Sequence, residues 1–227
     1  MKADQLAVVQ GWPHTVVTLR RWRRTPWSVL GAWALGSLLV TAALLAATWL
    51  VAANAVPDAT HRSYPGITAP VTANDFRYVL GRNFTVLALH SLACVAGFMA
   101  GWVRPGDQRS RMQSHAGPLA IVFVTGATLF SLLTQANVLG HVGADLSHQI
   151  AISPHALMLA ILPHAVPELF AVFLPLAAWS IASRRGAWHE LLAATLVTTA
   201  IAIPLIVLAA WIETYVTPGI LLGLHSR

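Results

Sequence analysis

Residues 150–182 read IAISPHALMLAILPHAVPELFAVFLPLAAWSIA, and this apolar run decides the fold. As one helix its 33 residues would be about 50 Å long at ~1.5 Å per residue, but the hydrocarbon core of a bilayer is only about 30 Å thick. Pro163 and Pro167 each lack an N–H and crowd the preceding turn, so they predict a helix break. We therefore expect a crossing over residues 164–182, preceded by a short re-entrant or interfacial helix over residues 150–162.

The composition is that of a membrane protein. Hydrophobic residues make up 56% of the chain and charged residues 10%, whereas a soluble domain has roughly 25% charged residues. The mean hydropathy is +0.65. The formal net charge of +6 comes from clustered arginines and not from a basic surface interleaved with aromatic residues, so no nucleic-acid partner is predicted. The single cysteine, Cys94, excludes internal disulfides.

The predicted fold is an all-α, polytopic membrane helix bundle. Five spans are expected, over residues 28–53, 84–103, 116–139, 164–182 and 188–211. They form one transmembrane domain over residues 28–227, and residues 1–27 precede it as an amphipathic, basic N-terminal segment. A polar external loop is predicted over residues 54–80 and a polar turn over residues 140–153.

Arginine placement predicts the orientation of these spans. Three clusters, within residues 20–24, 104–111 and 184–185, fall on one side of a five-span arrangement. Arginine and lysine are in excess on the cytoplasmic side of membrane proteins. We therefore expect a multi-pass protein of the cytoplasmic (inner) membrane, with its N-terminus in the cytoplasm and its C-terminus outside.

The few polar residues inside the spans are the candidate site. Ionisable groups at membrane depth are costly and usually functional, and His164 and Glu168 are four residues apart on one helix face. In the five-span arrangement, polar residues from four spans meet in the outer half of the membrane. The candidate residues are Asn83, His90, Gln135, Asn137, His164, Glu168 and Glu213. We expect His164 to contact Glu168, Glu213 or Asn137, with Asn83 as a bridging amide.

Three interpretations of this cluster stay open. It could be polar glue that fixes helix order, at ~0.6 kcal/mol per hydrogen bond. It could bind a ligand, an ion or a partner's segment, because broken helices expose backbone carbonyls in transporters. An intramembrane metal-dependent hydrolase could combine His164 and Glu168 with His141, His148 or His155, but the His-Glu-x-x-His motif is absent. No catalytic residue, metal ligand set or cofactor is predicted.

Several motifs together resemble one family. Leu162-Pro163-His164-Ala165-Val166-Pro167-Glu168-Leu169 is similar to the Pro-His-Gly-(aliphatic)-Pro-Glu-Leu signature of the stage II sporulation protein M family of integral membrane proteins. Asn83, Asn137-Val138-Leu139-Gly140 and the segment from Trp211 to Pro218 resemble further motifs of that family in the same order. The resemblance covers about residues 80–220. Ala165 replaces the usual glycine, and Arg82 replaces one asparagine of a pair.

The resemblance implies a bacterial or archaeal membrane protein with no known catalytic activity. In endospore formers the namesake recruits peptidoglycan-remodelling partners into a complex, although many relatives occur in organisms that do not sporulate. We therefore expect a non-enzymatic multipass scaffold or assembly factor. Its expected partners are the lipid bilayer, other membrane or cell-envelope proteins and a second copy in a homo-oligomer. A transporter or permease-like component is the alternative.

Overall fold

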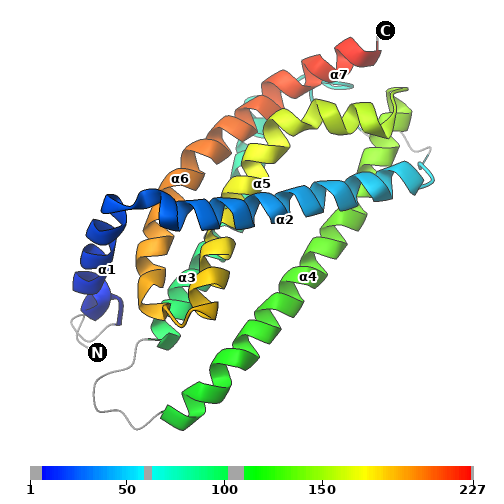
Figure 1. The fold of residues 1–227 in the computed structure, drawn as a ribbon. Coiled ribbons are helices and arrows are strands. Elements are labelled where there is room, and N and C mark those ends of the chain that lie inside the picture. The colour runs from blue at the N-terminus through cyan, green and yellow to red at the C-terminus, as the bar shows by residue number, and fades with distance from the viewer. Residues whose placement is uncertain (1–6, 59–62, 102–109, 226–227) are drawn as a thin grey trace.

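The computed structural model describes residues 7–58, 63–101 and 110–225, and it confirms the all-α fold class (Figure 1). Helices hold 88% of the residues, and the described ranges contain no strand beyond one isolated bridge between Pro65 and Ala69. The elements are α1 (Ala7–Arg24), α2 (Pro26–Asn54), α3 (Ala73–Gly101), α4 (Ser110–Gln149), α5 (Pro154–Arg184), the 3-10 turn η2 (Trp188–Glu190), α6 (Leu191–Trp211), the π-helical turn η3 (Ile212–Val216) and α7 (Thr217–His225).

Helix α5 lies at the centre of the bundle. It packs against α2, α3 and α6, whereas α4 packs mainly on α2 and its N-terminal half stands apart from the other helices in Figure 1. The largest buried cluster runs through the middle of α5. Its members are Leu44, Leu87, Ala136, Ala171, Val172, Phe173, Leu176, Ala202 and Ile206. Four elements therefore meet around α5.

Four helical segments in the described part of the chain are long and apolar enough to cross a membrane. They are Pro26–Asn54, Ala73–Met99, Pro154–Arg184 and Trp188–His225. These segments coincide with or overlap the first, second, fourth and fifth predicted spans. The third, residues 116–139, lies within α4, where several side chains fall outside the described residues. The protein is thus a multipass membrane protein.

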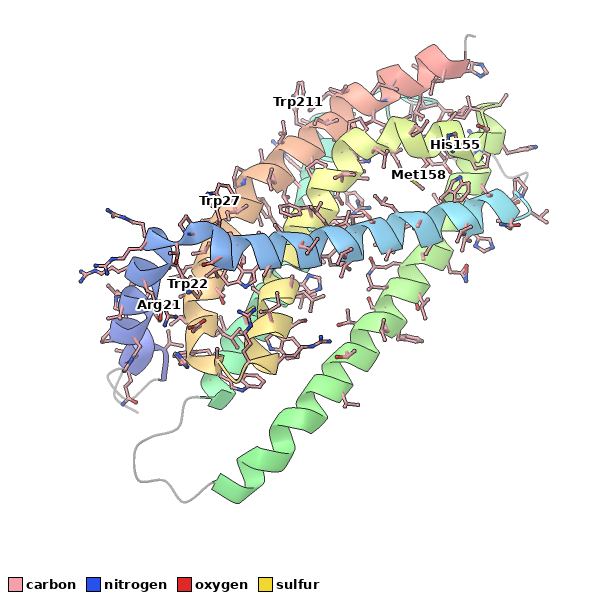
Figure 2. All side chains as sticks on the ribbon, in the orientation of Figure 1. Arg21, Trp22, Trp27, His155, Met158 and Trp211 are labelled. Carbon is pink, nitrogen blue, oxygen red and sulfur yellow. The ribbon has the colours of Figure 1, made fainter. Side chains whose placement is uncertain are left out.

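The predicted amphipathic segment forms α1. Trp22 packs edge-on against Trp33 of α2, with ring centroids 5.1 Å apart, and Arg21 forms an ion pair with Glu190. Figure 2 shows both Arg21 and Trp22 beside α6. The exposed side of the helix carries Arg20, Arg23 and further arginines, so α1 is held by one face and presents basic residues on the other.

The polar connections are shorter than predicted. Helix α3 begins at Ala73, so the loop predicted over residues 54–80 spans only residues 55–72. Asp75 explains the early start, because its Oδ2 accepts hydrogen bonds from the Thr72 N–H and the Thr72 hydroxyl, both at 2.7 Å. The Asp75 carboxylate thus satisfies the free backbone N–H of Thr72 at the helix start.

Helix α4 also extends beyond the prediction. The turn predicted over residues 140–153 is helical up to Gln149. Asp145, in this added part, is buried and accepts a hydrogen bond from the Asp58 N–H at 2.8 Å. Asp145 thus pairs with the loop after α2, whereas His141 and Ser147 bond carbonyls of α4 itself, so these polar residues did not signal the end of the helix.

The predicted break at Pro163 and Pro167 is corrected to a bend. Helix α5 continues from Pro154 to Arg184 through both prolines, and its first part turns away from the rest in Figure 1. Each proline removes one hydrogen bond and pushes on the preceding turn, which kinks a helix without ending it when neighbouring helices support the backbone. The helix starts where the Ser153 hydroxyl accepts the Ala156 N–H at 3.1 Å.

Helix α6 continues into α7 through the π-helical turn η3. The Thr217 N–H bonds the Ile212 carbonyl, five residues earlier. Pro218 follows at once, and a proline has no N–H for the carbonyl four residues before it. The wider turn accommodates that loss and places Glu213 on a backbone that is not a regular α-helix.

Candidate functional site

Three charged side chains from three elements form the charged cluster: Arg82 of α3, Glu168 of α5 and Glu213 of η3. The Arg82 Nη2 atom lies 3.8 Å from Glu168 Oε1 and 3.9 Å from Glu213 Oε1. Both contacts are ion pairs, but their distances exceed the 2.7–3.2 Å of an N–H···O hydrogen bond. The Glu168 side chain is 13% exposed and Arg82 is 50% exposed, so the guanidinium reaches in from the rim.

Asn83 is the most deeply buried polar member of the site. Its side chain is 3% exposed, and its Oδ1 accepts a long hydrogen bond from Arg82 Nε at 3.5 Å. The amide lies beside the Glu168 carboxylate. Its Nδ2 is buried and makes no hydrogen bond within the described residues. An unpaired buried donor costs free energy, so Asn83 has binding capacity that the described chain leaves unused.

His164 joins the site through a different partner from the one expected. Its Nδ1 lies 2.8 Å from the Thr217 hydroxyl, and both side chains are buried. We expected His164 to contact Glu168, Glu213 or Asn137. The described structure shows its bond to the threonine hydroxyl instead. The bond connects α5 to the start of α7, directly after the π-helical turn. His164 and the charged cluster therefore fasten the same two segments.

A cavity of about 680 Å³ lies beside the charged cluster, between α3, α4 and α5. We call it the lateral groove. Its polar wall includes Arg82, Asn83, Glu168 and Gln135, and its apolar wall includes residues from all three helices. The apolar lining residues are Val86, Leu89, Ala127, Leu132, Val138, Leu139, Leu169, Val172 and Phe173. His90 also lines it, with its ring 6.0 Å from that of Phe173.

The structure separates Asn137 from the other predicted residues. Asn137 is exposed, does not line the lateral groove, and its backbone carbonyl bonds His141 Nδ1 at 2.9 Å. Gln135 does line the groove, and its Nε2 donates to Ser131 at 3.0 Å. Residues two apart on a helix point in nearly opposite directions, so Gln135 and Asn137 could not both join one site. Placing Asn137 in the cluster was wrong.

The histidines considered as metal ligands do not gather at one point. Within the described residues, no group of three or more His, Cys, Asp or Glu side chains is placed to hold a metal ion. His155 packs against Trp49, with ring centroids 6.4 Å apart, on the first part of α5 (Figure 2). Nothing in the described residues supports the metal-dependent hydrolase interpretation.

Two site residues were not among the predicted ones. Arg82 supplies the positive charge of the cluster, and Thr217 supplies the partner of His164. A signal for Arg82 was present, because two acids in apolar helices require a cation and Arg82 lies directly beside Asn83 in the sequence. Thr217 lay in the segment from Trp211 to Pro218 that resembles a family motif, but nothing in that segment indicated that it would be the partner of His164.

The helices, the charged cluster and the lateral groove define a multipass α-helical membrane protein with a polar site built from α3, α5 and η3. Comparison with protein families gives the particular family. The chain matches the family described as Stage II sporulation protein M over residues 37–218, and it belongs to that family. This confirms the resemblance noted in the sequence. Comparisons with curated proteins and with solved structures gave no match.

Proposed function

We propose that this protein is a non-enzymatic membrane scaffold that docks other membrane or cell-envelope proteins. The observation that carries the proposal is the charged cluster, in which Arg82 connects two acids from separate elements. An ion pair between helices fixes their relative position, and that is what a docking platform requires. The family membership supports a membrane protein without a known enzymatic activity.

The docking surface that we propose lies on α4. This helix packs mainly on α2, and its remaining sides expose large apolar residues such as Phe130 at 74% and Leu133 at 68%. These two residues are three apart and therefore share one face. Apolar faces at membrane depth contact either lipid or another helix, so a partner that covers α4 would replace lipid there.

The proposed location is the cytoplasmic membrane, with the N-terminus inside. The arginines of α1 and the exposed Arg184 and Arg185 at the end of α5 support this orientation. The charged cluster would then lie near the outer face, where envelope partners are available.

Site-specific photo-crosslinking in native membranes tests the scaffold. A photoreactive residue at Phe130 should give discrete protein adducts, and the same adducts should form from Leu133. The control position is Ile203 of α6, which is 43% exposed but lies away from α4. Adducts to an envelope protein support docking, and adducts to a second copy identify a homo-oligomer. Lipid adducts alone at Phe130, or the same pattern at Ile203, would refute the proposal.

A transporter or permease-like component is the second candidate, and the lateral groove is the observation that favours it. Transport requires the site to open to both sides in turn. In a Cys94→Ala background, a cysteine at Thr128 in the groove should then react with impermeant reagents from either side of the membrane. If the protein is a scaffold, the cysteine should react from one side of the membrane at most. Removing other proteins should not change its reactivity.

A further inference from the structure

The lateral groove is lined by residues of α3, α4 and α5. Helix α3 and α4 share few contacts, because α4 is held by α2 and diverges from the bundle (Figure 1). At membrane depth, a gap between α3 and α4 would face acyl chains and not water. Any occupant must therefore be largely apolar on the side that enters from the bilayer.

The charged side chains of the groove lie at one end, and most of the remaining lining is apolar, with the polar residues His90, Thr128, Ser131 and Thr134 among it. Arg82, Asn83, Gln135 and Glu168 lie at the polar end. His90 lies eight residues further along α3 than Arg82, about 12 Å away at a rise of ~1.5 Å per residue, and it stands beside Phe173 of α5 in the wall. The groove thus resembles the profile of an amphiphile, with a head at the cluster and a chain beside the apolar wall.

The polar end has unused hydrogen-bond donors. Asn83 Nδ2 is buried without a hydrogen bond in the described chain, and Arg82 stands farther than hydrogen-bond distance from both acids. Glu213 does not line the groove, so its buried Oε2 does not belong to the polar end. The polar end contains one basic side chain, Arg82, and one acidic side chain, Glu168, so it can donate to a negative group and also accept from a positive one.

We propose that the lateral groove binds one phospholipid with a primary ammonium headgroup, of the phosphatidylethanolamine class. Its phosphate oxygens accept hydrogen bonds from Arg82 and Asn83, and its ammonium donates to Glu168. An acyl chain lies along Val86, Leu132 and Phe173. This inference goes beyond the proposed scaffold and does not depend on the identity of any protein partner.

The same groups disfavour the other common headgroups. A choline headgroup has no N–H with which to satisfy the Glu168 carboxylate. A glycerol headgroup has no ammonium to balance the phosphate, so that lipid brings a net negative charge beside Glu168, and like charges repel at this depth. The site therefore distinguishes lipids by the head alone, even when their acyl chains are identical.

Native mass spectrometry of the purified full-length chain tests the proposal. The protein is exchanged into detergent with phosphatidylethanolamine, phosphatidylcholine or phosphatidylglycerol of identical acyl chains. One phosphatidylethanolamine should be retained about tenfold more strongly than either competitor, which corresponds to about 1.4 kcal/mol. Soluble phosphoethanolamine should bind much more weakly because it leaves the apolar wall uncovered. Equal retention of the three lipids would mean non-specific annular lipid and would overturn the proposal.

Two pairs of matched variants locate the site. Arg82→Gln should lose the headgroup preference, whereas Arg77→Gln on the exposed face of the same helix should keep it. Ala127→Trp fills the apolar part of the groove and should abolish retention. Gly126→Trp places the same side chain into open space outside the groove and should not. If Arg82→Gln unfolds the protein, the tryptophan pair decides, and equal retention in that pair contradicts the proposed site.

Discussion

Arg82 decides how this chain tolerates two acids inside apolar helices. Glu168 was predictable because an acid in a long apolar run is conspicuous, and Glu213 was found by counting spans. The arginine was missed because it lies at the start of a span, where a basic residue is ordinary. Asn137 was misplaced because helix phase within α4 was not applied to neighbouring polar residues. The sequence therefore showed which residues are unusual, but not how their side chains pair.

The hydrogen bond between His164 and Thr217 gives a prediction at this scale. Thr217→Val keeps the shape of the side chain but leaves the buried His164 Nδ1 without its partner. We expect a loss of about 0.6–1.7 kcal/mol of stability, the range measured for hydrogen bonds between membrane helices. The measurement is thermal unfolding in mild detergent. Thr134→Val is the control, since its hydroxyl bonds only its own helix and is exposed. Equal melting of the two variants would argue against the bond.

At the scale of elements, the lengths of the apolar runs predicted the membrane-crossing helices well. The polar residues predicted the ends of those helices poorly. The crossings follow from runs of apolar residues, which need no tertiary information. The ends of α3 and α4 depend on pairs such as Asp75 with Thr72 and Asp145 with Asp58, which only the folded chain brings together. The prolines of α5 bend the helix and do not end it, because the surrounding helices support it.

The contact of α2 with α4 gives the prediction for this scale. A Cβ added at Gly140 would lie 2.5 Å from the Val51 side chain and 3.0 Å from the Thr48 carbonyl. Gly140→Ala should therefore separate the two helices and cost about 1–3 kcal/mol, the usual range for overpacking. Gly126→Ala on the same helix meets open space and should be neutral or stabilising. Thermal unfolding of both variants measures the difference, and an unchanged Gly140→Ala protein would contradict this packing.

For the whole molecule, the expected orientation rests on the arginine clusters. The structure places Arg184 and Arg185 at the end of α5, after which the chain turns back into α6. Charge bias predicts which end of the bundle faces the cytoplasm, but helix packing is the same in either orientation, so packing does not determine it.

Cysteine labelling of intact cells checks this orientation. Val56, after α2, is 89% exposed, and Arg185 is exposed at the opposite end. Val56→Cys should react with an impermeant reagent added outside, whereas Arg185→Cys should react only after the cells are opened. The native Cys94 is fully buried and should stay silent. Labelling of Arg185→Cys from outside would reverse the topology.

The central claim is that α3 and α5 are joined at Arg82 and Glu168. A double-mutant cycle of Arg82→Gln and Glu168→Gln, read by thermal unfolding of the full-length protein, tests it most directly. The account predicts that the stability losses of Arg82→Gln and Glu168→Gln are coupled by about 0.5 kcal/mol or more. The stability losses of Arg77→Gln and Glu168→Gln should be additive. Additive losses in the Arg82 cycle would show that the two side chains do not meet.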